Sequence, residues 1–229
     1  MKILVLAAMN KEIELLLSNL STYELIEDCN SRVYKSNFDS HEILIGQSGI
    51  GKVNAAFTST YLIGKYSPDY VINSGVAGGI SGNVHPGSVL LADKVVYHDV
   101  WCGPGTIFGQ ADGCPLFFEA DGRMLKLVEE IAREMKFDIF KGLLCSGDQF
   151  ISDIEEVRQI KEKFPEGIGC DMESAAIAQV AFKQQVPFIA IRVISDNPSN
   201  GENIQEYKDF WNDAPSRTFN VVFKLIQKL

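Results

Sequence analysis

Short apolar runs that alternate with amphipathic segments are the feature of this sequence that most restricts its fold. The runs are residues 3–8, 42–48, 70–73, 88–97, 139–146 and 188–195. Runs of this length and composition are typical of β-strands buried inside an α/β protein. Between them, apolar residues recur at helical spacing, as at Ile13, Leu16 and Leu20. The alternation predicts an α/β fold in three layers, α/β/α, with a central mixed, twisted sheet.

The segments between these runs complete the predicted order of elements. Weaker strands are expected at 23–27 and 32–36, and helices at 53–66, 123–136, 154–164, 173–183 and, for the most part, 205–229. Asn10 is expected to cap the first helix, and Pro215 to break the last one or start a second. A glycine-rich turn is expected at 74–79 and a loop at 99–115. Because no linker, repeat or change of composition interrupts the chain, we expect residues 1–229 to form a single catalytic domain.

Charge and cysteine content limit the partners and the compartment of the protein. The net charge of the 229 residues is −9, which disfavours nucleic acid and anionic membranes as partners. The first apolar stretch ends at Asn10, and no window approaches 18 apolar residues, so we expect no signal peptide and no membrane span. The five cysteines form no C-x-x-C pair, which favours reduced thiols and a cytoplasmic location.

Carboxylates collect where the predicted strands end. Glu12 follows the first strand, Glu173 begins a helix rich in small residues, and Asp196 follows the last strand. Each one alone could serve as a helix cap or interact with a helix dipole. Because sites in open α/β sheets lie beyond the carboxyl ends of the strands, the three together favour an active site at that edge.

Metal and nucleotide cofactors are not indicated by the sequence. The three histidines, His41, His85 and His98, lack the spacing of metal ligands. The glycine-rich segment 74–79 has neither a G-x-G-x-x-G pattern nor the lysine of a P-loop. We therefore expect an enzyme without a cofactor and without a bound metal.

Seven motifs in order give the sequence a resemblance to a known family, the methylthioadenosine/S-adenosylhomocysteine nucleosidases of the nucleoside phosphorylase superfamily. The resemblance covers nearly the whole chain. The motifs are Ala8-Met9-x-x-Glu12, Ser48-Gly49-Ile50-Gly51-Lys52-Val53-Asn54-Ala55-Ala56, Asn73-Ser74-Gly75-x-Ala77-Gly78-Gly79, Tyr97-His98-Asp99, Ser146-Gly147-Asp148-x-Phe150-Ile151, Asp171-Met172-Glu173-x-x-Ala176 and Arg192-x-Ile194-Ser195-Asp196.

The resemblance implies a nucleosidase that hydrolyses the N-glycosidic bond of these adenine nucleosides, with Asp196 as the acid that protonates the departing adenine and Glu12 as the group that positions and activates water. It also implies substrate contacts across the rest of the site. Glu173 would accept the ribose hydroxyls and Met172 would pack under the sugar, while Phe150 and the backbone of Ile151 would hold the base. The other substrate-binding residues would be Met9 and Ile50 on the sugar and thioalkyl side, Gly78 and Arg192 near the water, Ser195 beside the acid, and Tyr207 or Phe210 as a C-terminal aromatic cover.

The chemistry of the reaction requires such groups. Adenine leaves poorly unless it is protonated, and burial without a cationic partner would raise the pKa of Asp196 enough to supply that proton. Two further carboxylates, Glu12 and Glu173, would stabilise the positive charge that develops on the sugar. As in inverting glycosidases, the acid and the group that activates water should lie well apart to leave room for the water.

A phosphate-dependent purine nucleoside phosphorylase is the first alternative. Such an enzyme needs cations around the phosphate, usually several arginines, but only Arg192 of the six arginines lies in a site motif. Asn73 stands where related phosphorylases tend to carry an Arg. Hydrolysis is therefore favoured. Val76 stands where many of the nucleosidases have Ser or Thr, so a hydroxyl that could hold the water is missing.

A non-catalytic nucleoside-binding protein of the same fold is the second alternative. It is disfavoured because both Glu12 and Asp196 remain. The resemblance further implies a homodimer, with residues 53–66 and the loop 99–115 as contacts. The part of this loop at 100–110 departs from the familiar pattern of the family, and the sequence does not rank methylthioadenosine, S-adenosylhomocysteine, 5′-deoxyadenosine and aminodeoxyfutalosine as substrates.

Overall fold

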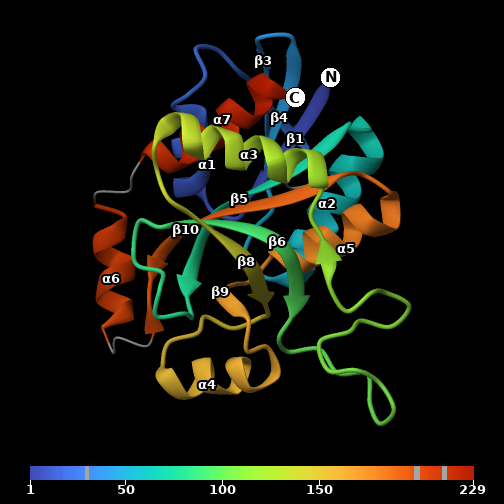
Figure 1. The fold of residues 1–229 in the computed structure, drawn as a ribbon. Helices are drawn as coiled ribbons and strands as arrows, with labels where there is room; N and C mark the ends of the chain where they lie inside the picture. Colours follow the sequence, from blue (N-terminus) through green and yellow to red (C-terminus); the bar gives the residue numbers. More distant parts are fainter. Residues whose placement is uncertain (29–30, 199–201, 213–215) are drawn as a thin grey trace.

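A computed structural model of the chain describes residues 1–28, 31–198, 202–212 and 216–229 (Figure 1). Strands and helices alternate along most of it. The elements are β1 (Lys2–Ala7), α1 (Asn10–Leu17), β2 (Glu24–Asp28), β3 (Ser31–Phe38), β4 (His41–Gln47), α2 (Lys52–Tyr66), β5 (Tyr70–Gly79), β6 (Val89–Tyr97), β7 (Phe118–Glu119), α3 (Gly122–Met135), β8 (Ile139–Ser146), α4 (Ile154–Lys163), β9 (Gly167–Asp171), α5 (Ser174–Gln184), β10 (Phe188–Asp196), α6 (Asn203–Phe210) and α7 (Ser216–Lys228).

The strands form one mixed sheet that closes partly on itself. Its order is β10-β6-β8-β9-β5-β1-β4-β3-β2, with β7 beside β6, and β10 also pairs with β5. Five strands, β5, β10, β6, β8 and β9, therefore make a closed circuit. Strands β1, β4, β3 and β2 extend from β5, in that order, as the open and twisted part of the sheet. The predicted α/β class with a mixed sheet is confirmed, and the closure is a feature that the sequence did not predict.

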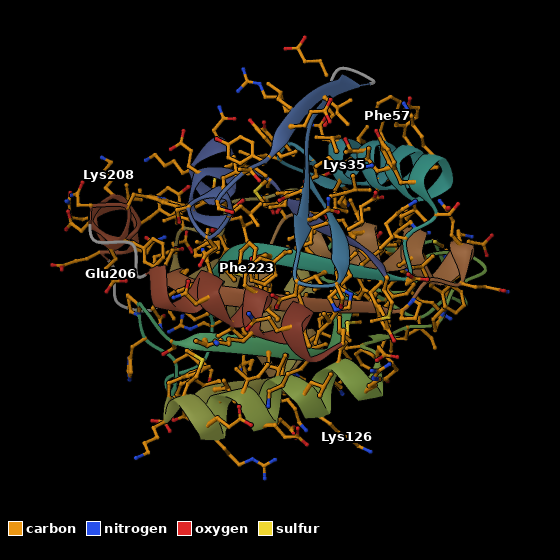
Figure 2. All side chains as sticks on the ribbon, turned by 90° about the horizontal axis from the view of Figure 1, so that it is seen from above. Lys35, Phe57, Lys126, Glu206, Lys208 and Phe223 are labelled. Carbon is orange, nitrogen blue, oxygen red and sulfur yellow. The ribbon has the colours of Figure 1, made fainter. Side chains whose placement is uncertain are left out.

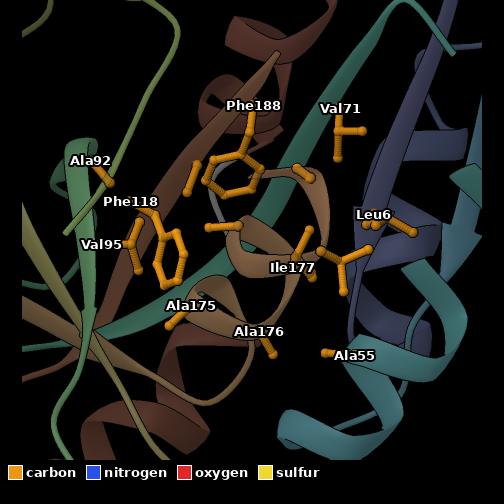
Figure 3. Close-up of a cluster of buried hydrophobic side chains, with 14 of the residues drawn as sticks. Leu6, Ala55, Val71, Ala92, Val95, Phe118, Ala175, Ala176, Ile177 and Phe188 are labelled. Carbon is orange, nitrogen blue, oxygen red and sulfur yellow. The ribbon is translucent and has the colours of Figure 1, made fainter. Parts of the chain in front are cut away.

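Helices cover the sheet on both sides and give the three predicted layers (Figure 1). One buried apolar cluster joins α1, α3 and α7 to the sheet, and includes Phe219 and Phe223 of α7. A second cluster joins α2 and α5 to the opposite side, where Ala55 and Ile177 face Leu6 and Phe188 (Figure 3). The small side chains at the start of α5 allow this close packing. A third, smaller cluster places α4 against β8 and β9.

Parallel pairing brings several strand ends to one edge of the sheet. β1 runs parallel to β4 and β5, and Ala7 at its end pairs with Gln47 at the end of β4. β10 runs parallel to β5, and Asp196 at its end pairs with Gly78. β8 runs parallel to β9 and brings Ser146 opposite Asp171. The residues that follow these ends meet at the edge that the sequence predicted for the site.

Residues 74–79 are strand, which corrects the predicted turn. β5 continues to Gly79 because this stretch pairs with β10 and, at Gly78 and Gly79, with β9. The glycines let the neighbouring strands approach. A Cβ on Gly79 would lie 2.8 Å from Val84 Cγ2, and one on Gly78 would lie 3.2 Å from the Sγ of Cys170.

Other element boundaries differ in smaller ways. Asn10 is the first residue of α1, and Met9 takes the cap position predicted for Asn10. Asp196 is the last residue of β10 and does not follow it, and β7 and β9 were not predicted. Pro215 lies outside the described residues. Within the described part of the chain, no helix is both long and apolar enough to cross a membrane.

Candidate active site

A pocket lies at the carboxyl ends of β1, β5, β9 and β10. It contains about 610 Å³ of empty space, including its open mouth, a volume that suits a small-molecule site. Its wall combines carboxylates with apolar and aromatic side chains. The lining residues are Ala8, Met9, Glu12, Ile50, Val76, Ala77, Gly78, Gln149, Phe150, Ile151, Cys170, Asp171, Met172, Glu173, Ser195, Asp196 and Tyr207.

Glu12 is a buried carboxylate held by three backbone N–H groups. Its Oε2 accepts from Ala8 (2.8 Å) and Met9 (2.9 Å), and its Oε1 accepts from Val76 (2.9 Å). The first two bonds arise because Glu12 is the third residue of α1 and folds back onto the helix cap. Burial raises the pKa of Glu12, while Arg192 and the three N–H groups act to lower it. The carboxylate is thereby fixed in position at the pocket wall.

Asp196 reaches the same pocket through an irregularity in β10. Ile194 pairs with Ala77 and Asp196 with Gly78, so Ser195 is an extra residue in the ladder. Neighbours in a regular strand point to opposite faces, but here both Ser195 and Asp196 line the pocket. Ser195 Oγ donates to Asp196 Oδ1 at 2.6 Å, and Asn203 Nδ2 donates to Oδ2 at 3.3 Å.

Asp196 has a raised pKa. Burial is the main cause, and the hydrogen bonds from Ser195 and Asn203 act in the opposite direction. No lysine or arginine within the described residues forms an ion pair with it, in contrast to the arginine that acts on Glu12. A buried carboxyl of this kind holds a proton more readily than an exposed aspartate.

Glu173 supplies a third carboxylate at the start of α5. Its Oε1 accepts from the backbone N–H of Gly51 at 2.8 Å, which joins α5 to the turn before α2. Burial raises the pKa of Glu173, and the neighbouring charge of Asp171 raises it further. The same turn carries Ile50, whose half-exposed side chain lies at the rim of the pocket.

Aromatic and sulfur-containing side chains form the opposite part of the wall. Phe150 and Tyr207 meet edge to face, with ring centroids 5.5 Å apart. The Tyr207 hydroxyl lies 3.5 Å from the Sδ of Met9, which links α6 to the start of α1. Ile151 is buried beneath Phe150, which is itself 47% exposed. An apolar slot with an exposed ring at its edge suits a flat, aromatic ligand.

Two predicted site residues do not line the pocket. Arg192 is buried behind the wall, where its guanidinium pairs with Asp171 at 2.6 Å. Phe210 is buried in the core beside α7 and packs edge to face on Trp211. Of the two aromatics proposed as a cover, only Tyr207 faces the pocket. The other predicted side chains, Met9, Glu12, Ile50, Gly78, Phe150, Ile151, Met172, Glu173, Ser195 and Asp196, all line it.

The structure also adds residues that sequence reasoning missed. Cys170, Gln149 and Asp171 line the pocket, and a buried polar cluster extends behind it from Asp171. The Asp171-Met172-Glu173 motif could have indicated Asp171, because a buried acid next to a site residue needs a partner. The partners of Asp171 come from distant parts of the chain, so the sequence alone did not identify them.

The pocket is therefore an acidic site with an apolar slot. None of its described lining residues is Lys, Arg or His. The described residues also contain no group of three or more His, Cys, Asp or Glu side chains arranged to hold a metal. The wall offers three buried acids with raised pKa values, of which Glu12 alone is held by three backbone N–H groups and Asp196 alone has no cation among the causes of its shifted pKa. This set can donate a proton, orient a water and stabilise a developing cation.

The fold and the pocket define an α/β/α protein with a carboxylate-lined pocket at the ends of its strands. The family model described as "Phosphorylase superfamily" matches residues 2–227, and the chain belongs to this superfamily. The predicted family resemblance is confirmed.

Individual relatives share the whole length of the chain. The 5′-methylthioadenosine/S-adenosylhomocysteine nucleosidase of Lysinibacillus sphaericus is 37% identical, over 100% of both chains. The crystal structure of the S-adenosylhomocysteine nucleosidase of Streptococcus pyogenes, in complex with 5-methylthiotubericidin, is 32% identical. It has a TM-score of 0.95 and covers 100% of this chain and 97% of its own. Futalosine hydrolase of Helicobacter pylori is 28% identical, with a TM-score of 0.94, over 100% and 98% of the two chains.

Proposed function

We propose that the chain is a nucleosidase that hydrolyses the N-glycosidic bond of 5′-methylthioadenosine and S-adenosylhomocysteine. The products are adenine and the corresponding thio-ribose. The observation that carries the proposal is the placement of Glu12 and Asp196 on the wall of one pocket, where neither is neutralised by a cation on that wall. Full-length relatives with this name support the choice of substrate.

Asp196 acts as the general acid in the proposed reaction. Burial raises its pKa and favours the protonated form, which can donate to a ring nitrogen of adenine as the bond to ribose breaks. Ser195 and Asn203 fix the orientation of the carboxyl through its two oxygens. Protonation makes adenine a neutral leaving group and lowers the barrier to its departure.

Glu12 positions and activates the attacking water. Three backbone N–H groups fix its carboxylate, and the remaining lone pair of Oε1 can accept from a water in the pocket. Val76 contributes through its backbone N–H, and its side chain offers no hydroxyl to the water. The water therefore depends on Glu12 more than it would with Ser or Thr at this position.

Glu173 and the apolar wall bind the nucleoside. We assign Glu173 to the ribose hydroxyls and Met172 to the underside of the sugar. The base lies against Phe150, with the backbone of Ile151 at its edge and Gly78 and Ser195 beside the acid. Tyr207 covers the site, and Met9 and Ile50 contact the thioalkyl group. Arg192 acts from behind the wall through its charge on Glu12.

Hydrolysis is favoured over phosphorolysis by the charge of the pocket. A phosphate dianion needs several cations, and the described wall has none. The pure protein should release adenine from methylthioadenosine at the same rate with and without phosphate, and should yield the free thio-ribose. A phosphate requirement with a sugar-1-phosphate product would instead establish a phosphorylase. Binding without any adenine release would establish a non-catalytic nucleoside-binding protein.

The range of substrates follows from the groups that the pocket contacts. Adenine and ribose contact most of the assigned residues, and the 5′ substituent reaches the exposed rim at Ile50. A relative named futalosine hydrolase supports a tolerant 5′ side. Turnover should therefore be compared for methylthioadenosine, S-adenosylhomocysteine, 5′-deoxyadenosine and aminodeoxyfutalosine. Equal rates for all four would contradict recognition of the thioalkyl group.

We further propose that residues 1–229 act as one catalytic domain, in the cytoplasm, as a homodimer. Free thiols at Cys102, Cys114, Cys145 and Cys170 support a reducing compartment. Exposed apolar side chains on α2 and on the loop at 99–115 support self-association. Cell fractionation tests the cytoplasmic location. Sedimentation equilibrium tests the homodimer, and a monomer at micromolar concentration would contradict it.

A further inference from the structure

A cluster of five polar residues extends from Asp171 on the pocket wall to buried side chains behind it. The Asp171 cluster consists of Asn73 on β5, Ser146 on β8, Asp171 on β9, Ser174 on α5 and Arg192 on β10. All five side chains are more than nine-tenths buried. The cluster joins four strands of the closed part of the sheet to helix α5, so its geometry is set by the fold and not by solvent.

Asp171 accepts hydrogen bonds at both oxygens of its carboxylate. Its Oδ2 accepts from Arg192 Nε at 3.0 Å and Nη2 at 2.6 Å, and from Ser174 Oγ at 2.5 Å. Its Oδ1 accepts from the hydroxyl of Ser146. Arg192 Nη2 also donates to Asn73 Oδ1 and, at 2.8 Å, to Ser174 Oγ. One side of the guanidinium is therefore fixed completely.

The other side of the guanidinium faces Glu12. A Cβ placed on Gly75 would lie 2.6 Å from Arg192 Nη1 and 2.5 Å from Glu12 Oε1, so the two groups flank the same bare glycine. Arg192 and Glu12 form no ion pair within 4.0 Å. The charge of Arg192 instead acts on Glu12 across Gly75 and favours the ionised carboxylate. The other titratable groups that face Glu12 are Glu173 and Tyr207. Arg192 is the only cation among these neighbours in the described chain.

We propose that Asp171 is a positioning residue of the reaction, because it holds Arg192 in the orientation that turns Nη1 toward Glu12 across Gly75. The proposal rests on the proposed function, in which Glu12 activates water. Asn73 and Ser174 support the same orientation from the two sides of Nη2. Asp171 thus acts on the water through Arg192 and Glu12.

A double-mutant cycle separates this role from general stabilisation of the fold. The variants are Asp171→Asn, Arg192→Gln and the two combined, which removes both charges together. We expect each single change to lower kcat/KM for methylthioadenosine by roughly 10- to 100-fold, with most of the loss in kcat. The combined variant should match Arg192→Gln alone, because Asp171 has nothing left to orient. Losses that multiply in the combined variant would overturn the proposal.

The pH profile distinguishes orientation from a direct effect of charge. If Asp171 orients Arg192, then Asp171→Asn weakens the cationic influence on Glu12, whose pKa rises, and the acidic limb of kcat/KM moves to higher pH as it does in Arg192→Gln. If Arg192 stayed in place, loss of the Asp171 charge would move this limb to lower pH. A downward shift or an unchanged limb would therefore contradict the proposal.

Two further variants keep the test decisive. Asp171→Glu retains the carboxylate and should restore part of the activity and of the normal pH limb. Ser174→Ala removes one bond from Asp171 and one from Arg192 without removing a charge, and should shift the limb in the same direction by less. If thermal unfolding shows that Asp171→Asn does not fold, Ser174→Ala takes its place in the test. Turnover of methylthioadenosine by the unaltered chain tests the proposed function itself. A failure of the proposed function can therefore be distinguished from a failure of the role proposed for Asp171.

Discussion

Glu12 and Asp196 are both buried carboxylates on one wall, but their neighbours differ in a way that separates their roles. Glu12 receives three backbone N–H bonds and the influence of Arg192, all of which favour the charged form. Asp196 receives two side-chain hydrogen bonds and has no cationic neighbour among the causes of its shifted pKa. Two acids in unlike surroundings can hold different protonation states at one pH, as an acid–base pair requires.

Replacement of the proposed acid tests this division of roles. We expect Asp196→Asn to lower kcat for methylthioadenosine by about 10²- to 10⁴-fold, because an amide cannot donate the proton that adenine needs. Binding of the substrate should change little, since Asn keeps the size of the side chain and one oxygen that accepts from Ser195. Steady-state kinetics and equilibrium binding measure the two effects. Unchanged turnover would refute the assignment of Asp196 as the acid.

The hydrogen bond from Ser195 gives a prediction for pH dependence. It favours the ionised form of Asp196 and so lowers the pKa of that carboxyl, against the larger effect of burial. Ser195→Ala removes the bond, so the pKa of Asp196 should rise, and the loss of kcat/KM that accompanies its deprotonation should move to higher pH. The control is Ser18→Ala, on an exposed serine after α1. A shift to lower pH would contradict this account.

The carboxylates of the site were predictable from the sequence, whereas the groups that position them were not. Glu12 and Asp196 could be placed together because carboxyl ends of neighbouring strands share one edge. The bulge at Ser195 and the bonds of Asp171 depend on pairing between β5, β9 and β10, which no local pattern encodes. For the same reason Arg192 was predicted beside the water but lies behind the wall.

At the scale of elements, α4 shows how a helix cap orders a segment of the pocket. The carboxylate of Asp153 accepts from the backbone N–H groups of Glu155 and Glu156, and Glu156 in turn accepts from Ser152 and Asp153. This capping box begins two residues after Ile151. The turn that presents Phe150 and Ile151 to the ligand is thereby attached to a packed helix.

Removal of this cap should cost a measurable amount of stability. We expect Asp153→Ala to lower the free energy of unfolding by about 1 kcal/mol, because two N–H groups at the start of α4 lose their acceptor. Chemical denaturation measures the change. Glu162→Ala, on the exposed side of the same helix, is the matched control and should be nearly neutral. Equal losses in the two variants would show that the cap is not the cause.

β5 is the element on which sequence interpretation was wrong, and its packing explains the error. Six residues from Ser74 to Gly79 include three glycines, which is a pattern typical of a turn. In the fold these glycines remain extended because β9, β10 and the side chain of Glu12 approach the backbone closely. The helices α2 to α5 were predicted to within one residue, since their apolar periodicity is local, whereas α1 ends three residues before Leu20 and the stretch 205–229 contains two helices, α6 and α7.

At the scale of the whole molecule, apolar side chains remain exposed beside the mouth of the pocket. Val53 and Phe57 of α2 have exposed fractions of 79% and 57%, and Trp101 and Ile107 of the loop at 99–115 are also exposed. Figure 2 shows Phe57 at the surface of α2. An ion pair of 2.7 Å between Lys52 and Asp99 holds these two segments together. Exposed apolar side chains on two segments that an ion pair joins favour a protein–protein interface here.

The interface prediction can be tested with a single charge. In the proposed homodimer Phe57 is covered by the second copy, so Phe57→Glu would bury an unpaired carboxylate and should shift the chain toward the monomer in sedimentation equilibrium. Because the surface adjoins Ile50 at the pocket rim, we also expect KM for methylthioadenosine to rise as the dimer dissociates. Leu25→Glu, on the exposed side of β2, is the control and should leave the assembly unchanged. If both variants sediment as the unaltered chain does, α2 is not the interface, and the exposed rings of the loop at 99–115 become the next surface to alter.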